Sequence, residues 1–200
     1  MTATRQAGLF QEYNNNYTLK PVNLRSVPQR SPFRYPGGKT WFVPNFREEM
    51  NHMRTKPEML IEPFAGGGII SLTALFEKYV NRVIMIEIDE DVAAVWQSVV
   101  SGNGPWLADR ILSFKLSRES LLSELSKPAT DINERAFQTI LKNRTYHVGV
   151  LAKGSGLIKY GENGKSIGSR WYPRTLADRV LNLEKISGRI DLRLDEGIRF

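Results

Sequence analysis

The sequence predicts an α/β protein with a Rossmann-like parallel sheet and helices on both faces. Two observations carry this prediction. MLIEPF (59–64) and VIMIEI (83–88) are short, continuous apolar runs of strand length, and each precedes a segment with helical spacing of its apolar residues. A glycine triplet (66–68) stands between the first run and its helix. Buried strands that alternate with helices are typical of a parallel sheet covered on both faces.

In the first half of the chain, a turn at Pro36-Gly37-Gly38 precedes a helix predicted from Thr40 onward. The segment 69–80 repeats apolar residues at helical spacing and forms the helix between the two strands. The next helix starts at Asp89, because three acidic residues suit the positive end of a helix dipole.

In the second half, three helices are expected at 106–114, 118–125 and 132–142, followed by glycine-rich loops or a hairpin over 143–174. A last helix follows, with Thr175 as its N-cap, and RIDLRL (189–194) alternates as a strand does. We place a flexible arm at 1–31, a core at 32–104, a helical and Gly/Lys-rich region at 105–188 and a return to the sheet at 189–200.

Length and composition exclude several classes of protein and of binding site. The 200 residues suit one domain, and no apolar run of about 18 residues predicts a membrane span. The absence of cysteine excludes disulfides and thiolate metal sites, and with only His52 and His147 we expect no metal site. We therefore expect a cytoplasmic protein.

The charge of +7 is unevenly distributed. Residues 1–60 carry nine basic and four acidic residues, 61–140 carry seven and eleven, and 141–200 carry twelve and six. Between Lys142 and Arg174 there are seven basic residues and one acid, Glu162. Such a stretch favours a polyanionic partner, although net charge alone supports only non-specific attraction.

The glycine triplet after the first strand indicates a nucleotide site. Gly38-Lys39-Thr40 mimics a P-loop, but Phe33 stands where that loop needs glycine. The dinucleotide fingerprint fits better, with Ser71 at its third small position and Glu87 about 20 residues on, where an acid binds ribose hydroxyls. The spacing does not choose NAD over other adenosine cofactors.

The charge of Glu62 favours one of these adenosine cofactors over NAD. It ends the first strand and would repel a pyrophosphate dianion, whereas it would attract the amino group and sulfonium of S-adenosylmethionine. An NAD-dependent oxidoreductase remains an alternative, as does a non-catalytic DNA-binding module.

Three motifs resemble the Dam-type (alpha-class) DNA adenine-N6 methyltransferases, and they occur in that family's order. They are Phe33-Arg34-Tyr35-Pro36-Gly37-Gly38-Lys39, Glu62-Pro63-Phe64-Ala65-Gly66-Gly67-Gly68 and Ile86-Glu87-Ile88-Asp89. Asn143-Arg144 with Arg170-Trp171-Tyr172-Pro173 resembles the target-recognition insertion, and Leu192-Arg193-Leu194-Asp195 resembles a strand-and-acid motif near the catalytic one.

The resemblance implies an enzyme that transfers a methyl group from S-adenosylmethionine to adenine N6 of a flipped base in double-stranded DNA. Tyr35 and Lys39 would close over the cofactor. Glu87 would hold the ribose hydroxyls, Ile88 would pack on the adenine face and Asp195 would reach the adenine amino group. The full cofactor set is Tyr35, Lys39, Glu62, Phe64, Gly66, Gly68, Glu87, Ile88 and Asp195. Contacts to DNA are expected from Arg144, Lys153, Lys159, Lys165, Arg170 and Arg174.

The family's Asp-Pro-Pro-Tyr motif does not occur in the 200 residues, so no catalytic residue is assigned. We expect a sheet that is incomplete at the C-terminus and a chain inactive by itself. It would be a shortened chain, half of a split enzyme or a natural remnant. An incomplete sheet leaves an open strand edge, which predicts self-association or a complementary C-terminal fragment as partner.

Overall fold

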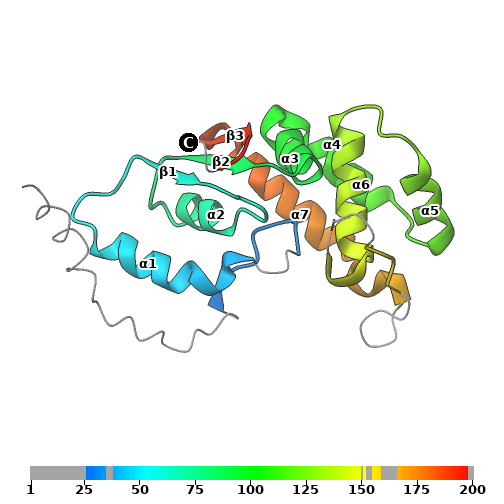
Figure 1. The fold of residues 1–200 in the computed structure, drawn as a ribbon, viewed down its shortest axis with the longest axis horizontal. Helices are drawn as coiled ribbons and strands as arrows, with labels where there is room; N and C mark the ends of the chain where they lie inside the picture. Colours follow the sequence, from blue (N-terminus) through cyan, green and yellow to red (C-terminus); the bar gives the residue numbers. More distant parts are fainter. Residues whose placement is uncertain (1–25, 35–37, 150, 152–154, 159–165, 198–200) are drawn as a thin grey trace, which may run out of the picture.

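The sheet of this computed structural model has three parallel strands in the order β1 (Met59–Glu62), β2 (Arg82–Glu87) and β3 (Ile190–Leu194) (Figure 1). Residues 26–34, 38–149, 151, 155–158 and 166–197 are described. Glu62 lies opposite Met85, and Glu87 lies opposite Leu194. The carboxyl ends of the three strands therefore lie side by side at one end of the sheet. The predicted α/β fold with a Rossmann-like parallel sheet flanked by helices is confirmed.

The first half of the chain follows the predicted order. A 3-10 turn (Lys39–Phe42) leads into α1 (Val43–His52), and α2 (Ile69–Phe76) connects β1 to β2. Helix α2 packs against both of these strands, and α1 lies along its other side (Figure 1). Helix α3 (Glu90–Ser98) begins after Asp89, whose carboxylate accepts the amides of Asp91 and Val92. The acidic start of this helix therefore caps it, as predicted.

Four helices fill the second half: α4 (Gly104–Ser113), α5 (Arg118–Ser126), α6 (Ile132–Thr145) and α7 (Pro173–Glu184). A π-helical turn (Val99–Asn103) joins α3 to α4, and short 3-10 turns lie at His147–Gly149, Ser166–Arg170 and Ser187–Arg189. An isolated antiparallel bridge joins Tyr146 to Leu157. The N-cap of α7 is Tyr172, so the expectation of Thr175 was wrong; Pro173 occupies the first turn, where its fixed φ suits a helix start.

One hydrophobic core joins the sheet to the helices. Helix α6 packs on α3, and α4 packs on α7. Trp96, Leu107, Phe137 and Leu176 are fully buried in the same cluster as Val83 of the central strand. The helical region at 105–188 is thus continuous with the sheet core. On the opposite sheet face, Met59 and Ile61 are 45% and 43% exposed and do not belong to this cluster.

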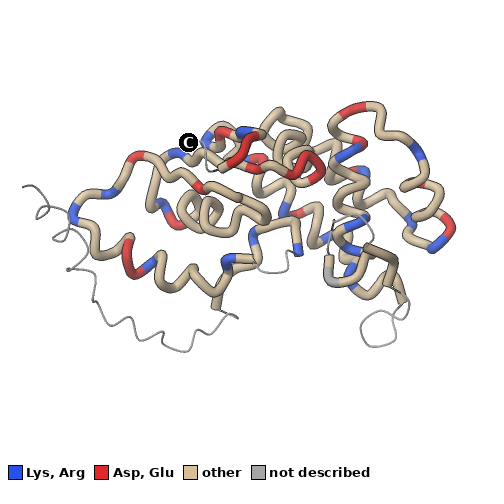
Figure 2. The backbone as a smooth tube through the Cα atoms, in the orientation of Figure 1, with Lys and Arg blue, Asp and Glu red and all other residues tan. Residues whose placement is uncertain are grey.

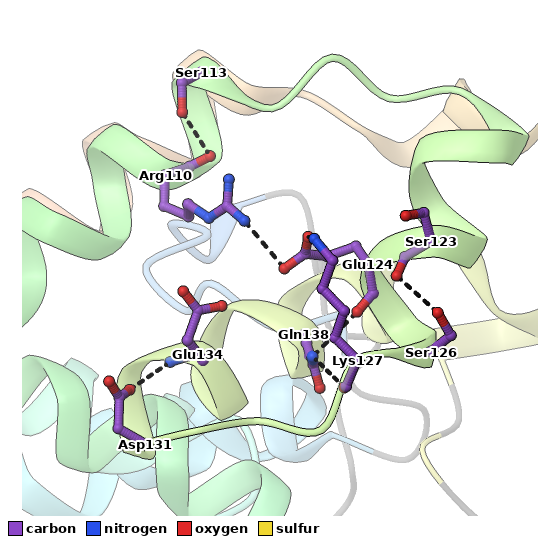
Figure 3. A network of polar contacts seen from close by, with 9 residues as sticks. All are labelled: Arg110, Ser113, Ser123, Glu124, Ser126, Lys127, Asp131, Glu134 and Gln138. Carbon is purple, nitrogen blue, oxygen red and sulfur yellow. Dashed lines mark hydrogen bonds and ion pairs between the residues drawn. The ribbon is translucent and has the colours of Figure 1, made fainter.

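A polar network holds α5 against its neighbours (Figure 3). The buried carboxylate of Glu124 pairs with Arg110 on α4 and with Lys127, both at 3.1 Å. Gln138 on α6 donates to the carbonyls of Glu124 and Lys127 at 3.1 and 3.0 Å. The network supplements the small apolar contact of α5, in which Leu121 is fully buried.

The last residues of the predicted flexible arm, 26–31, include both buried and exposed side chains. Val27 is buried, and Arg30 pairs with Glu77 at 2.9 Å. Arg47 of α1 pairs with the same carboxylate at 2.6 Å. Burial opposes ionisation of Glu77, but hydrogen bonds from Arg47 and Arg30 hold its pKa below the ordinary value. Residues 1–25 lie outside the described part.

Candidate functional site

A cavity of about 350 Å³ opens at the carboxyl end of the sheet. One wall is the segment that precedes α1, and the other is the turn between β1 and α2. The lining residues are Gln29, Ser31, Phe33, Arg34, Gly38, Lys39, Thr40 and Phe64–Ile69. The structure thus brings together Lys39, Phe64, Gly66 and Gly68 of the predicted cofactor set. Tyr35 lies outside the described residues.

The glycine turn has a conformation that only a few residue types tolerate. Gly66 and Gly68 have φ of 51° and 63°, and Phe64 adopts a φ of 57° although it has a side chain. A Cβ on Gly68 would lie 2.7 Å from Met85 and 3.0 Å from Trp96. Gly68 is therefore required both by its left-handed φ and by close packing. Strained residues such as Phe64 concentrate at ligand sites.

The carboxylate of Glu87 holds this turn in place. It is buried and accepts backbone N–H groups from Gly66 at 2.6 Å, Asp89 at 2.9 Å and Ile88 at 3.0 Å. Glu87, which the sequence predicts to bind the ribose hydroxyls, therefore already accepts three backbone amides. A carboxylate has about four acceptor positions, so backbone amides occupy three of those of Glu87, which does not itself line the cavity.

Glu62 and Lys39 form an ion pair beside the cavity. Lys39 Nζ lies 2.8 Å from Glu62 Oε1 and 2.6 Å from the carbonyl oxygen of Phe64. The other carboxylate oxygen of Glu62 accepts the amide of Ser71 at 2.9 Å. Glu62 is buried, whereas the Lys39 side chain keeps about a third of its exposure. A positive group of the cavity lining thus meets a buried negative group that lies behind it.

Ile88 and Asp195 flank the cavity along the sheet edge instead of lining it. Ile88 is 58% exposed, and the amide of Asp195 donates to the carbonyl of Glu87 at 3.2 Å. The ends of β2 and β3 are therefore adjacent. Gly197 packs tightly against the residues that follow β1. A Cβ on Gly197 would lie 2.9 Å from Pro63 and 3.3 Å from Phe64.

Sequence reasoning missed the far wall of the cavity. Ser31 was placed in the flexible arm, and Trp96 was not considered, yet Trp96 Nε1 donates to the carbonyl of Gly66 at 2.9 Å. Phe33 packs against Trp96 in a tilted arrangement, with ring centroids 5.9 Å apart and ring planes at 53°. Phe33 is the first residue of the stretch Phe33–Lys39 that resembles the family, and that position was the one signal available.

The basic residues assigned to DNA differ in their surroundings. Arg144 is buried, donates to the carbonyl of Pro32 and is inaccessible to a phosphate, so its assignment was wrong. Burial, with the positive charges of Arg179, Arg34 and Arg170 nearby, lowers the pKa of Arg144 to about 9. Arg170 is partly exposed at the end of the 3-10 turn Ser166–Arg170, and Arg174 is exposed in the first turn of α7. Lys153, Lys159 and Lys165 lie outside the described residues.

The segment between α6 and α7 lies at the lower right of Figure 2. Its described residues include basic charge (blue) and no acidic residue (red). Within the described ranges, no group of three or more His, Cys, Asp or Glu side chains is arranged to hold a metal ion. No helix found there has the length and apolar character required to cross a membrane.

Comparison with known proteins now adds to this geometry. A family model described as D12 class N6 adenine-specific DNA methyltransferase matches residues 35–145, more than half of the chain. No curated protein matches the sequence. The matched range contains the glycine turn, both strand-end glutamates and the helices α1 to α6. The chain belongs to the D12 class N6 adenine-specific DNA methyltransferase family.

Proposed function

We propose that the cavity binds S-adenosylmethionine and that the chain serves methyl transfer to adenine N6 in double-stranded DNA. The ion pair between Lys39 and Glu62 at the glycine turn carries the proposal. The methionine end of the cofactor is a zwitterion, with one carboxylate and one ammonium group. Lys39 would bind the carboxylate and Glu62 the ammonium, so each charge of the pair gains a ligand partner.

The rest of the cofactor would lie along the carboxyl ends of the strands. The remaining acceptor position of Glu87 suits a ribose hydroxyl, and the exposed side chain of Ile88 offers an apolar surface for adenine. NAD would bring a pyrophosphate dianion toward Glu62, which disfavours it. The bound cofactor supplies an electrophilic methyl group, and this chain's residues bind and orient it.

DNA would lie against the segment after α6 and the start of α7. Arg170 and Arg174, with Lys153, Lys159 and Lys165, would contact phosphates and fix the register of the duplex. The target adenine has to leave the helix to reach a transferable methyl group. We assign no catalytic residue, because the sequence contains no Asp-Pro-Pro-Tyr motif.

Calorimetric titration of the folded chain tests the cofactor assignment directly. S-adenosylmethionine and its demethylated product should bind, and NAD should not. Lys39→Met should weaken binding by about tenfold or more, since a charge-assisted hydrogen bond contributes about 1.5–3 kcal/mol. Arg54→Met, a change of an exposed cation outside the cavity lining, is the matched control. NAD binding in place of S-adenosylmethionine would contradict the proposal.

We also propose that the open edge of β1 pairs with another chain. Among the described residues β1 pairs with β2 alone, and its Met59 and Ile61 are half exposed. An unpaired strand edge of this kind is a template for association with a second copy or with a complementary fragment. Light scattering over a concentration series should show dimers, and Ile61→Lys should abolish them; a strictly monomeric wild type would contradict this assignment.

A further inference from the structure

Two arginine side chains of the helical region bind consecutive carbonyl groups near the N-terminal end of the described chain. Arg179 of α7 donates to the carbonyl of Ser31 at 3.1 Å, and Arg144, in the last turn of α6, donates to that of Pro32. Arg144 is buried, and Arg179 is half-buried. Because the two carbonyls are neighbours in the chain, the two guanidinium groups are held near each other.

The charges of these two guanidinium groups are not compensated. Within the described part of the chain, neither is paired with a carboxylate, and each binds a neutral carbonyl oxygen instead. Burial lowers the pKa of Arg144 to about 9, and three neighbouring positive charges act in the same direction, those of Arg179, Arg34 and Arg170. Burial also lowers the pKa of Arg179. A buried charge is costly unless an opposite charge accompanies it, so this place in the fold favours an anion.

Two buried polar groups in the same region have no hydrogen-bond partner among the atoms of the protein. They are Nε of Arg144 and the hydroxyl of Ser169, whose residues are only 4% and 3% exposed. Ser169 belongs to the 3-10 turn that packs against α6, and it directly precedes Arg170, whose charge reaches Arg144. Buried donors are nearly always satisfied by protein, by ordered water or by an ion. Both orphaned groups can donate to an anion.

We propose that Arg144, Arg179 and Ser169 form a binding site for a small inorganic anion such as chloride. The anion would accept hydrogen bonds from the unpartnered N–H of Arg144 and from the hydroxyl of Ser169, and it would compensate the adjacent positive charges. A water molecule could satisfy the donors but would leave the charges uncompensated. Burial excludes a phosphate of the DNA backbone as occupant. The three residues do not line the cavity, so the site is separate from the proposed cofactor site.

A chloride titration of stability tests the site without any assay of methyl transfer. We would unfold the full chain with urea, which brings no anion of its own, and exchange gluconate for chloride at constant ionic strength so that screening stays the same. A ligand that binds only the folded state stabilises it in a saturable way. At a chloride concentration ten times the dissociation constant, the ratio of folded to unfolded protein should rise about elevenfold.

Two variants locate the effect at the proposed site. Arg179→Met removes one of the two charges, and Ser169→Ala removes one donor from a small side chain, which keeps the test open if Arg179→Met does not fold. Both should lose most of the chloride dependence. Arg110→Gln is the matched control, because it breaks the ion pair with Glu124 and leaves the proposed site intact. It should keep the wild-type dependence even at lower stability.

Crystals grown in bromide give a direct second measurement, since bromide replaces chloride and its anomalous X-ray scattering locates it. A peak within hydrogen-bond distance of Arg144 Nε is the expected result. Stability that does not depend on chloride in the wild type overturns the proposal, and so does an equal dependence in the two site variants and the control. A water molecule in place of bromide beside Arg144 would overturn it as well.

Discussion

Two buried glutamates, Glu87 at the sheet edge and Glu124 in the helical layer, are satisfied in opposite ways. Both are about 95% buried. Glu87 accepts three backbone amides, and no cation is paired with it among the described contacts. Glu124 pairs with Arg110 and Lys127. A buried carboxylate can therefore be stabilised by dipoles in one place and by opposite charge in another.

In the function proposed above, Glu87 binds the cofactor whereas Glu124 has a structural role. Amide groups leave the negative charge of Glu87 uncompensated, so it can still attract a ligand hydroxyl as a strong acceptor. The two cations neutralise Glu124, and its carboxylate gains little from any further partner. Breaking such a pair mainly costs stability, because it leaves a buried charge without compensation.

The largest effect should come from the turn that Glu87 holds. Gly68→Val should lower the free energy of unfolding by about 1–2 kcal/mol for the left-handed φ and by about 1–3 kcal/mol for overpacking against Met85 and Trp96. Cofactor binding should be lost. Chemical denaturation and calorimetry measure both. Gly188→Ala is the control, because a Cβ there would meet nothing within 4 Å and Gly188 does not line the cavity. Wild-type stability in Gly68→Val would contradict the packing argument.

Glu87→Gln should affect binding more than any single change at Glu124. The amide keeps one acceptor oxygen and turns donor hydrogens toward backbone N–H groups, so the turn loosens. We expect cofactor affinity to fall by roughly tenfold to a hundredfold, the equivalent of about 1.5–3 kcal/mol for a charged hydrogen bond. Calorimetry on a variant with an unchanged circular dichroism spectrum is the measurement. Undiminished affinity would remove Glu87 from the site.

Glu124→Gln should show the reverse pattern. Loss of the charge leaves Arg110 and Lys127 without their partner, and the free energy of unfolding should fall by about 1–3 kcal/mol. Cofactor affinity should remain at the wild-type value, because none of the residues of this network lines the cavity. Equal losses of affinity in Glu124→Gln and Glu87→Gln would erase the distinction between the two glutamates.

The smallest effect should be the pH dependence contributed by Glu77. Arg47 and Arg30 lower its folded-state pKa below the ordinary 4.5, so its stabilising contribution is present above that value. It is lost as the pH falls through the folded-state pKa. Arg47→Met should flatten the acid limb of a stability–pH profile, measured by urea unfolding. An unchanged slope would show that this pair contributes nothing measurable.

Local patterns predicted the strands, the glycine turn and the order of the helices well. Apolar runs and glycines act within a few residues, which is why β1, β2 and α3 lie close to their expected bounds. The Thr175 cap failed because Pro173, two residues earlier, already suits the start of a helix. The Arg144 assignment failed because a positive residue in a basic run gives no local sign of burial.

The sequence by itself determined the α/β order, the family motifs and the strand-end glutamates, because each depends on residues that are neighbours in the chain. Only the tertiary structure decided that Lys39 pairs with Glu62, that Trp96 supports Gly66, and that Asn143 binds the backbone of Arg34. Asn143 and Arg34 are separated by 109 positions in the sequence. Such contacts depend on the packing of the whole chain, and no local pattern of residues encodes them.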